Sequence, residues 1–144
     1  MTPAQLTTFK GAILADANLA AARASGDMGA IVSYYNASGT GTIWRPNIAI
    51  SELNTAIVWS EFIALSQGQR DAYAALTNGT AVDATNANIR TGFSAIFGGT
   101  SITNLTALAQ RVPTRFESLF ATSQVSAVFG QTVSVADVAA ALGS

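Results

Sequence analysis

The chain has no cysteine and no histidine among its 144 residues. The absence of cysteine excludes disulfide bonds, thiolate metal sites and cysteine nucleophiles. The absence of histidine removes the most frequent general base and the most frequent metal ligand. The sequence therefore predicts that the protein is not an enzyme, and that it holds no cofactor and no metal ion.

Charged side chains are also scarce. Asp, Glu, Lys and Arg make up 10 % of the residues, compared with about 25 % in ordinary soluble domains, and Lys10 is the only lysine. Neutral polar side chains cost much less to bury than ions do, so this composition favours permanent association with other chains. A monomer that covers its surface with neutral polar residues is the alternative interpretation.

The few charges form no basic cluster, since the net charge is −1 and the seven cations are scattered. Binding to nucleic-acid phosphates depends on clustered Lys and Arg, so the sequence predicts no direct nucleic-acid ligand. It contains no run of 18 apolar residues and no basic amphipathic face, so no membrane partner is expected either. The first ten residues, MTPAQLTTFK, lack the pattern of a secretion signal.

Two acidic patterns are weak candidates for chemistry. Glu52 and Glu61 lie nine residues apart, which places them on opposite sides of a continuous helix. We expect one to stabilise a helix N-terminus and the other to be an ordinary surface charge. Asp83 begins a stretch similar to a calcium-binding loop, but Ser94 stands where the bidentate glutamate would be. An Asx turn before a helix explains that stretch better.

The spacing of apolar residues predicts a mainly α fold, a compact helical bundle of six to eight helices in a single domain spanning residues 1–144. Helix starts are indicated where a Ser or Thr precedes a Gln, Glu or Asp by three residues; these are Thr2, Ser66, Thr114 and Ser134. The segment 53–65 is apolar on nearly every side. Because a helix that is apolar all round is normally buried, this segment is predicted to be the most buried helix.

Two segments are expected to be extended. Residues 42–50 contain Pro46, which is confined to edge strands or irregular arms. Residues 125–133 are rich in β-branched side chains, and they either pair with 42–50 as a β-hairpin or remain separate. Extended backbone needs hydrogen-bond partners, and strand addition to a neighbouring subunit would supply them.

Trp44 and Arg45 in the first extended segment are the candidate subunit interface. Both residue types are enriched among side chains that dominate binding energy, and the pair precedes Pro46. Two interpretations stay open. The pair contacts a partner, or Trp44 covers the core of its own subunit with Arg45 stacked on it.

Several long segments resemble a group of small proteins common in tailed-phage genomes, where they lie among virion structural and assembly genes. The resemblance is carried by MTPAQLTTFKGAILAD, WSEFIALSQGQRDAYAALTNG, ATNANIRTGFSAIF and LAQRVPTRFESLFAT. It covers most of the chain and brings no catalytic or binding residues with it.

This resemblance implies a structural virion protein, with the role of a head–tail connector or adaptor subunit. Such subunits form homo-oligomeric rings, often twelve-fold, between portal and tail. The implied partners are further copies of the chain and other neck proteins, namely portal and tail components. The implied location is the virion, after synthesis in the bacterial host cytoplasm. The alternatives are a tail terminator, a tail tube protein, a capsid decoration protein, and an assembly chaperone for the head or tail.

Overall fold

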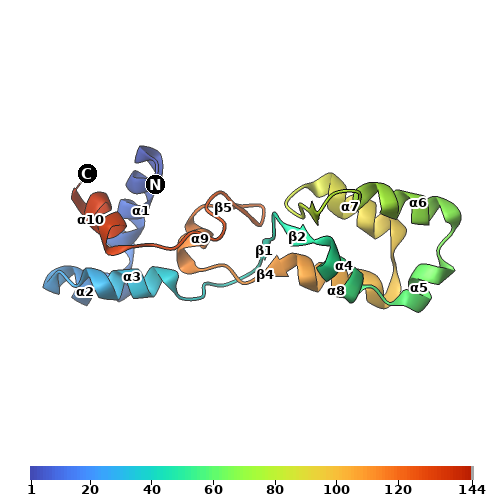
Figure 1. Cartoon of the computed structure of the whole chain (residues 1–144). Coiled ribbons are helices and arrows are strands. Elements are labelled where there is room, and N and C mark those ends of the chain that lie inside the picture. The colour runs from blue at the N-terminus through green and yellow to red at the C-terminus, as the bar shows by residue number, and fades with distance from the viewer. Residues whose placement is uncertain (144) are drawn as a thin grey trace. The chain divides into compact units, whose positions relative to one another are not determined.

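A computed structural model describes residues 1–143 (Figure 1). The chain is mainly α-helical, as the sequence predicts. Residues 1–143 form ten α-helices, one short 3₁₀ helix and six strands of two residues each. The predicted number of helices, six to eight, is therefore too low, because segments expected to be continuous are divided into shorter helices.

The contacts within the chain divide it into two compact units, where the sequence suggests a single domain. Unit 1 combines residues 1–41 with the described residues from Val112 onward, and unit 2 is the intervening segment Thr42–Arg111. The described chain thus has two clusters of buried apolar side chains, one in each unit.

Unit 1 brings the two ends of the described chain together (Figure 1). Its last helix, α10, packs against both α1 and α3. Its elements are α1 (Pro3–Ala15), η1 (Ala17–Leu19), α2 (Ala20–Ser25), α3 (Met28–Asn36), α9 (Arg115–Leu119), β5 (Ala121–Thr122), β6 (Val125–Ser126) and α10 (Val135–Gly143).

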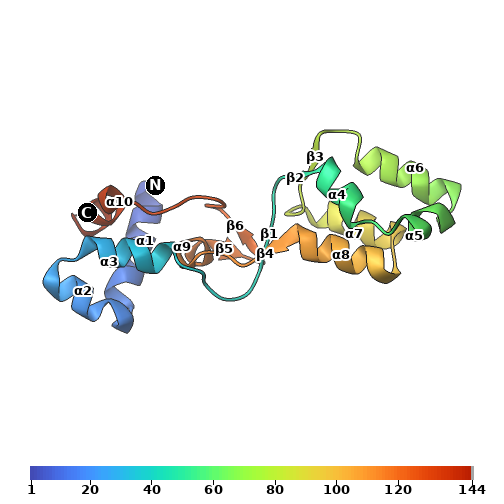
Figure 2. The ribbon, with the colours of Figure 1, turned by 60° about the horizontal axis from the view of Figure 1, so that its bottom comes forward.

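Unit 2 is a continuous segment in which α4 packs on α8 and α6 packs on α7 (Figure 2). The antiparallel pair β1–β4 joins its first and last elements, and β2 pairs with β3. The elements are β1 (Ile43–Trp44), β2 (Ile48–Ala49), α4 (Ile50–Ala56), α5 (Trp59–Ala64), α6 (Gln67–Leu76), β3 (Ala81–Val82), α7 (Ala87–Ile96), α8 (Gly99–Ala109) and β4 (Gln110–Arg111).

Of the two alternatives for 42–50 and 125–133, pairing with each other is wrong, and the segments remain separate. In the first segment, Ile43 lies opposite Arg111 and Ile48 lies opposite Val82. In the second, Val125 lies opposite Thr122 in a local hairpin. Only the first two residues of 125–133 are strand, and two of the others, Val128 and Val133, are buried in the core of unit 1.

The backbone of both extended segments finds partners within the chain. The Arg45 N–H donates to the Ala109 carbonyl at 2.9 Å, and the Arg45 carbonyl accepts from the Ala84 N–H at 3.0 Å. The Val133 N–H donates to the side-chain oxygen of Asn36 at 2.8 Å. These internal bonds remove the main argument for strand addition to a neighbouring subunit at these positions.

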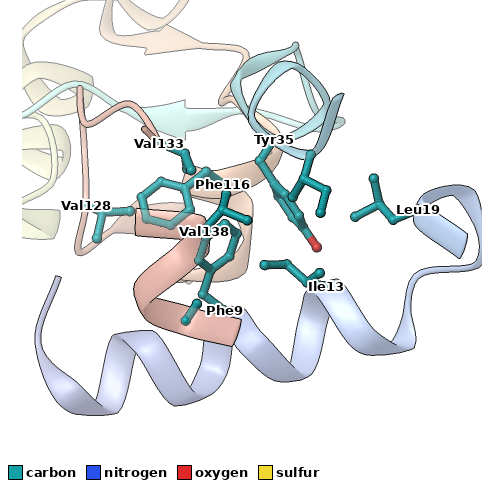
Figure 3. Close-up of a cluster of buried hydrophobic side chains, with 10 residues drawn as sticks. Phe9, Ile13, Leu19, Tyr35, Phe116, Val128, Val133 and Val138 are labelled. Atoms are coloured by element: carbon teal, nitrogen blue, oxygen red, sulfur yellow. The ribbon is translucent and has the colours of Figure 1, made fainter. Parts of the chain in front are cut away.

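Three aromatic rings form the centre of the unit 1 core (Figure 3). Phe9 of α1 makes edge-to-face contacts with Tyr35 of α3 at 4.9 Å and with Phe116 of α9 at 5.3 Å between ring centroids. Val128 and Val138 lie against this group and are fully buried. The core therefore joins segments from both halves of the discontinuous unit.

The segment 53–65 is not the most buried helix, which contradicts the prediction. It belongs to two short helices, α4 and α5, because Ile57 and Val58 adopt extended backbone conformations between them. β-Branched residues lose side-chain freedom in a helix, and the Val58 N–H is instead bound by the Ser101 hydroxyl at 3.0 Å. Leu53 and Ile57 are buried, whereas much of the apolar surface of α5 is exposed.

Candidate subunit interface

Trp44 lies half-buried in β1 and packs against the core of unit 2. The guanidinium carbon of Arg90, from α7, lies 4.6 Å from the centre of its ring. This is a cation–π contact, because the positive group faces the negative face of the indole. The stacking residue is thus Arg90, and the interpretation in which Arg45 stacks on Trp44 is wrong in that respect.

Arg45 binds the start of α4 and the end of α8. Its Nη2 donates to both oxygens of Glu52, at 3.0 and 3.2 Å, and its Nη1 donates to the Leu108 carbonyl at 3.1 Å. Glu52 also accepts from the Ala49 N–H at 3.0 Å, as expected for an acid at a helix N-terminus. The hydrogen bond from Arg45, followed by the one from Ala49, holds the pKa of Glu52 below its usual value.

Trp44 and Arg45 therefore have separate partners inside unit 2, Arg90 for the first and Glu52 for the second. The structure does not bring the two side chains together as one surface feature. Their role in a subunit interface stays a prediction, and it would require Trp44 to use the part of its ring that Arg90 leaves uncovered.

A second candidate surface lies on α5, where Trp59 and Ile63 form what we call the α5 patch. The two residues are four apart, so they share one face of the helix. Trp59 is 52 % exposed and Ile63 is 72 % exposed. The indole contacts Phe62 edge-to-face at 5.2 Å, which attaches the patch to the core of unit 2. Adjacent large apolar side chains that remain in water are typical of interaction surfaces.

The apolar pattern of 53–65 predicts these residues in the core, because one continuous helix there would be apolar all round. The Ser66 hydroxyl accepts from the Gln69 N–H at 3.2 Å and starts α6 directly after α5, as the sequence predicts. The break at Ile57 and Val58, which the apolar pattern does not indicate, starts α5 at Trp59 and limits it to six residues. A helix this short can bury one side and leave the other in solvent.

Glu61 lies two positions from both Trp59 and Ile63. Two positions correspond to about 200° around a helix, so Glu61 lies on the side of α5 away from the patch. Its carboxylate accepts from the Thr100 and Ser101 N–H groups at 2.9 and 2.8 Å, and so caps α8. The preceding Gly98 offers no capping side chain. Hydrogen bonds from Ser101, and then from Thr100, lower the pKa of Glu61. The prediction of an ordinary surface charge is wrong for this residue.

We expect the Glu61 cap to be lost in acid. Because the pKa of Glu61 is lower in the folded state than its ordinary value of 4.5, the cap stabilises the fold above about pH 4.5. That stabilisation disappears as the pH falls through the folded-state pKa. Urea unfolding at pH 7, 5 and 3.5 measures the free energy of unfolding. Between pH 7 and pH 3.5 this free energy should fall less for Glu61→Gln than for the unmodified chain. Equal pH dependence would contradict the assignment.

Within residues 1–143, no three His, Cys, Asp or Glu side chains lie close enough to hold a metal ion together. Asp83 forms the predicted Asx turn, because its Oδ1 accepts from the Thr85 N–H and hydroxyl at 2.8 and 2.6 Å. In the same described range, no helix is both long and apolar enough to cross a membrane. Comparison of the chain with protein-family models, curated proteins and solved structures finds no match.

Proposed function

We propose that this chain is a structural protein of a tailed-phage particle, and that it acts as a head–tail connector subunit in a homo-oligomeric ring between portal and tail. The resemblance of its segments to phage virion-module proteins supplies the phage context. The α5 patch is the observation that supports assembly. In this role the protein carries out no catalysis and requires no cofactor.

A ring closes when one surface of a subunit meets a different surface of the next at a fixed rotation. The α5 patch provides one apolar surface of this kind, and a chain with few charges offers much surface that is inexpensive to desolvate. Burying half of one large apolar side chain and most of another contributes about 2–3 kcal/mol per contact. Association costs more than this in lost translational and rotational freedom, so the neutral surface around the patch must supply the rest of each contact.

The composition of purified particles tests this proposal. Quantitative mass spectrometry of virions should find the chain in a small fixed copy number, and cryo-EM should place it in the neck. An assembly chaperone would be absent from mature particles. A capsid decoration protein would be present in hundreds of copies. Either of these results would reject the connector role.

Ile63→Ser is expected to weaken self-association while it leaves the fold intact. Ile63 is largely exposed, so its replacement should change the free energy of unfolding by no more than about 0.5 kcal/mol. If Ile63 is central to the contact, the loss of assembly should reach about 2 kcal/mol per contact. Sedimentation velocity over a range of protein concentrations measures this loss.

Two further variants make the result specific. Leu14→Ser removes another exposed apolar side chain, 52 % exposed, from α1 of unit 1 and should leave assembly unchanged. Trp44→Ala tests the other candidate surface. A loss of assembly without a loss of stability would support Trp44 as an interface residue, and a loss of stability alone would assign it to the core of its own unit. The α5 patch is wrong if Leu14→Ser weakens assembly as much as Ile63→Ser does.

A further inference from the structure

Unit 2 contains an open cavity of about 410 Å³ between its strands and the helices α4, α7 and α8. Its lining includes five side chains of the unit 2 core, all nearly or fully buried: Ile48, Leu53, Val82, Phe93 and Leu105. Cavities of about 300–1,000 Å³ with a mainly apolar lining and a few polar groups are typical of small-molecule sites. The cavity thus has the size and the wall chemistry of a binding site.

Arg90 is the one charged residue that lines this cavity within the described part of the chain. Its Nη1 donates to the carbonyls of Ala84 and Thr85 at 2.6 and 2.8 Å, and its guanidinium stacks on Trp44. These contacts fix the plane of the guanidinium without a neutralising carboxylate. A guanidinium carries five N–H donors, and both of these hydrogen bonds to carbonyls come from Nη1, so the Nη2 and Nε edge has the geometry to pair with a carboxylate.

The apolar walls and the single guanidinium of Arg90 together indicate which kind of ligand the cavity can bind. A cation would be repelled by Arg90, and a small inorganic anion would leave the apolar walls in contact with water. A planar guanidinium matches a carboxylate with two parallel hydrogen bonds. The apolar walls suit a hydrocarbon body. Thr91, Ser94 and Thr106 also line the cavity, and hydroxyl groups of this kind can bind water or the ligand head.

We propose that unit 2 binds a small apolar carboxylate of the medium-chain fatty-acid class. Its carboxylate pairs with Arg90, and its hydrocarbon chain occupies the cavity between α7 and α8. This site is separate from the α5 patch and does not depend on the phage role, so either proposal can fail without the other.

Isothermal titration calorimetry of the full chain with decanoate, below its micelle concentration, tests the site. We expect one decanoate per chain. Decanol lacks the charge, and it should bind at least about 10-fold more weakly, because hydrogen bonds to charged groups are the stronger ones. Acetate lacks the hydrocarbon body and should show no measurable binding. Equal affinity for decanoate and decanol would contradict the proposed pairing of the carboxylate with Arg90.

A matched pair of variants on α8 locates the binding. Thr106 lines the cavity and Thr103 does not, although both are exposed. Thr106→Phe should fill the mouth and abolish decanoate binding, whereas Thr103→Phe should bind as the unmodified chain does. Arg90→Lys keeps the charge but loses the planar fork, so its affinity should fall. The proposal is overturned if the unmodified chain fails to bind decanoate, or if Thr106→Phe binds it as tightly as Thr103→Phe.

Discussion

Phe9→Ala should lower the free energy of unfolding of unit 1 by about 3–5 kcal/mol, which is the usual cost of removing a buried aromatic side chain. Phe9 is fully buried, and its ring contacts both Tyr35 and Phe116. These two partners come from the two separate parts of the unit. The substitution therefore leaves a cavity at the point where both parts meet, and chemical denaturation followed by far-UV circular dichroism measures the loss.

The same helix supplies the control for this experiment. Leu14 lies on α1 and is 52 % exposed, so Leu14→Ala should change stability by no more than about 0.5 kcal/mol. Both tryptophans, Trp44 and Trp59, belong to unit 2. Their fluorescence follows unit 2 while the dichroism signal follows both units. If Phe9→Ala costs no more than Leu14→Ala, the proposed centre of the unit 1 core is wrong.

Glu117→Ala should destabilise unit 1 by about 2–5 kcal/mol, because it leaves two backbone donors without their acceptor. Glu117 is 1 % exposed. Its carboxylate accepts from the Thr114 N–H at 2.8 Å and from the Gly130 N–H at 2.6 Å. It therefore caps α9 and at the same time holds the segment that leads to α10. Urea denaturation at pH 7 measures the effect.

Two comparison variants separate the causes. Asp27 caps α3 by accepting from the Ala30 N–H at 2.9 Å, but on the surface. Asp27→Ala should therefore cost about 1 kcal/mol, the usual value for a cap in contact with water. Glu117→Gln keeps the size of the side chain but presents an NH₂ group to one of the two backbone donors. Its loss of free energy of unfolding should therefore lie between those of Glu117→Ala and Asp27→Ala. Equal costs for Glu117→Ala and Asp27→Ala would show that burial adds nothing.

The features predicted best from the sequence are those decided within a few residues. The capping boxes at Thr2, Ser66 and Thr114 are all present, and Ser134 exchanges hydrogen bonds with Asp137 as expected. In each case the side chain binds a backbone group three residues away. Such a bond depends on local conformation and is independent of the rest of the fold.

The features that were missed depend on residues far apart in the chain. Trp44 contacts Arg90, and Glu61 binds the N-terminus of α8, only because elements far apart in the chain pack together. The pattern of apolar residues shows that these helices form but leaves their neighbours undetermined. The α5 patch was missed for a related reason, because the number of apolar residues in 53–65 does not reveal where the helix breaks. The unit boundaries near Gly41 and Val112 were also missed, because no linker long enough to separate two units is visible in the sequence.

The division of unit 1 into two parts has a consequence for the order of folding. While Thr42–Arg111 is unfolded, joining the two parts closes a long flexible loop, at an entropic cost of about 4 kcal/mol for this length. Once unit 2 has folded, the β1–β4 pair holds Ile43 opposite Arg111. The chain before Ile43 and the chain after Arg111 then leave unit 2 from neighbouring positions, so most of the entropic cost of closing the loop no longer applies. Unit 2 is also fully synthesised before the second part of unit 1. We therefore expect unit 2 to form first during translation and to act as the template that brings α1 and α10 together.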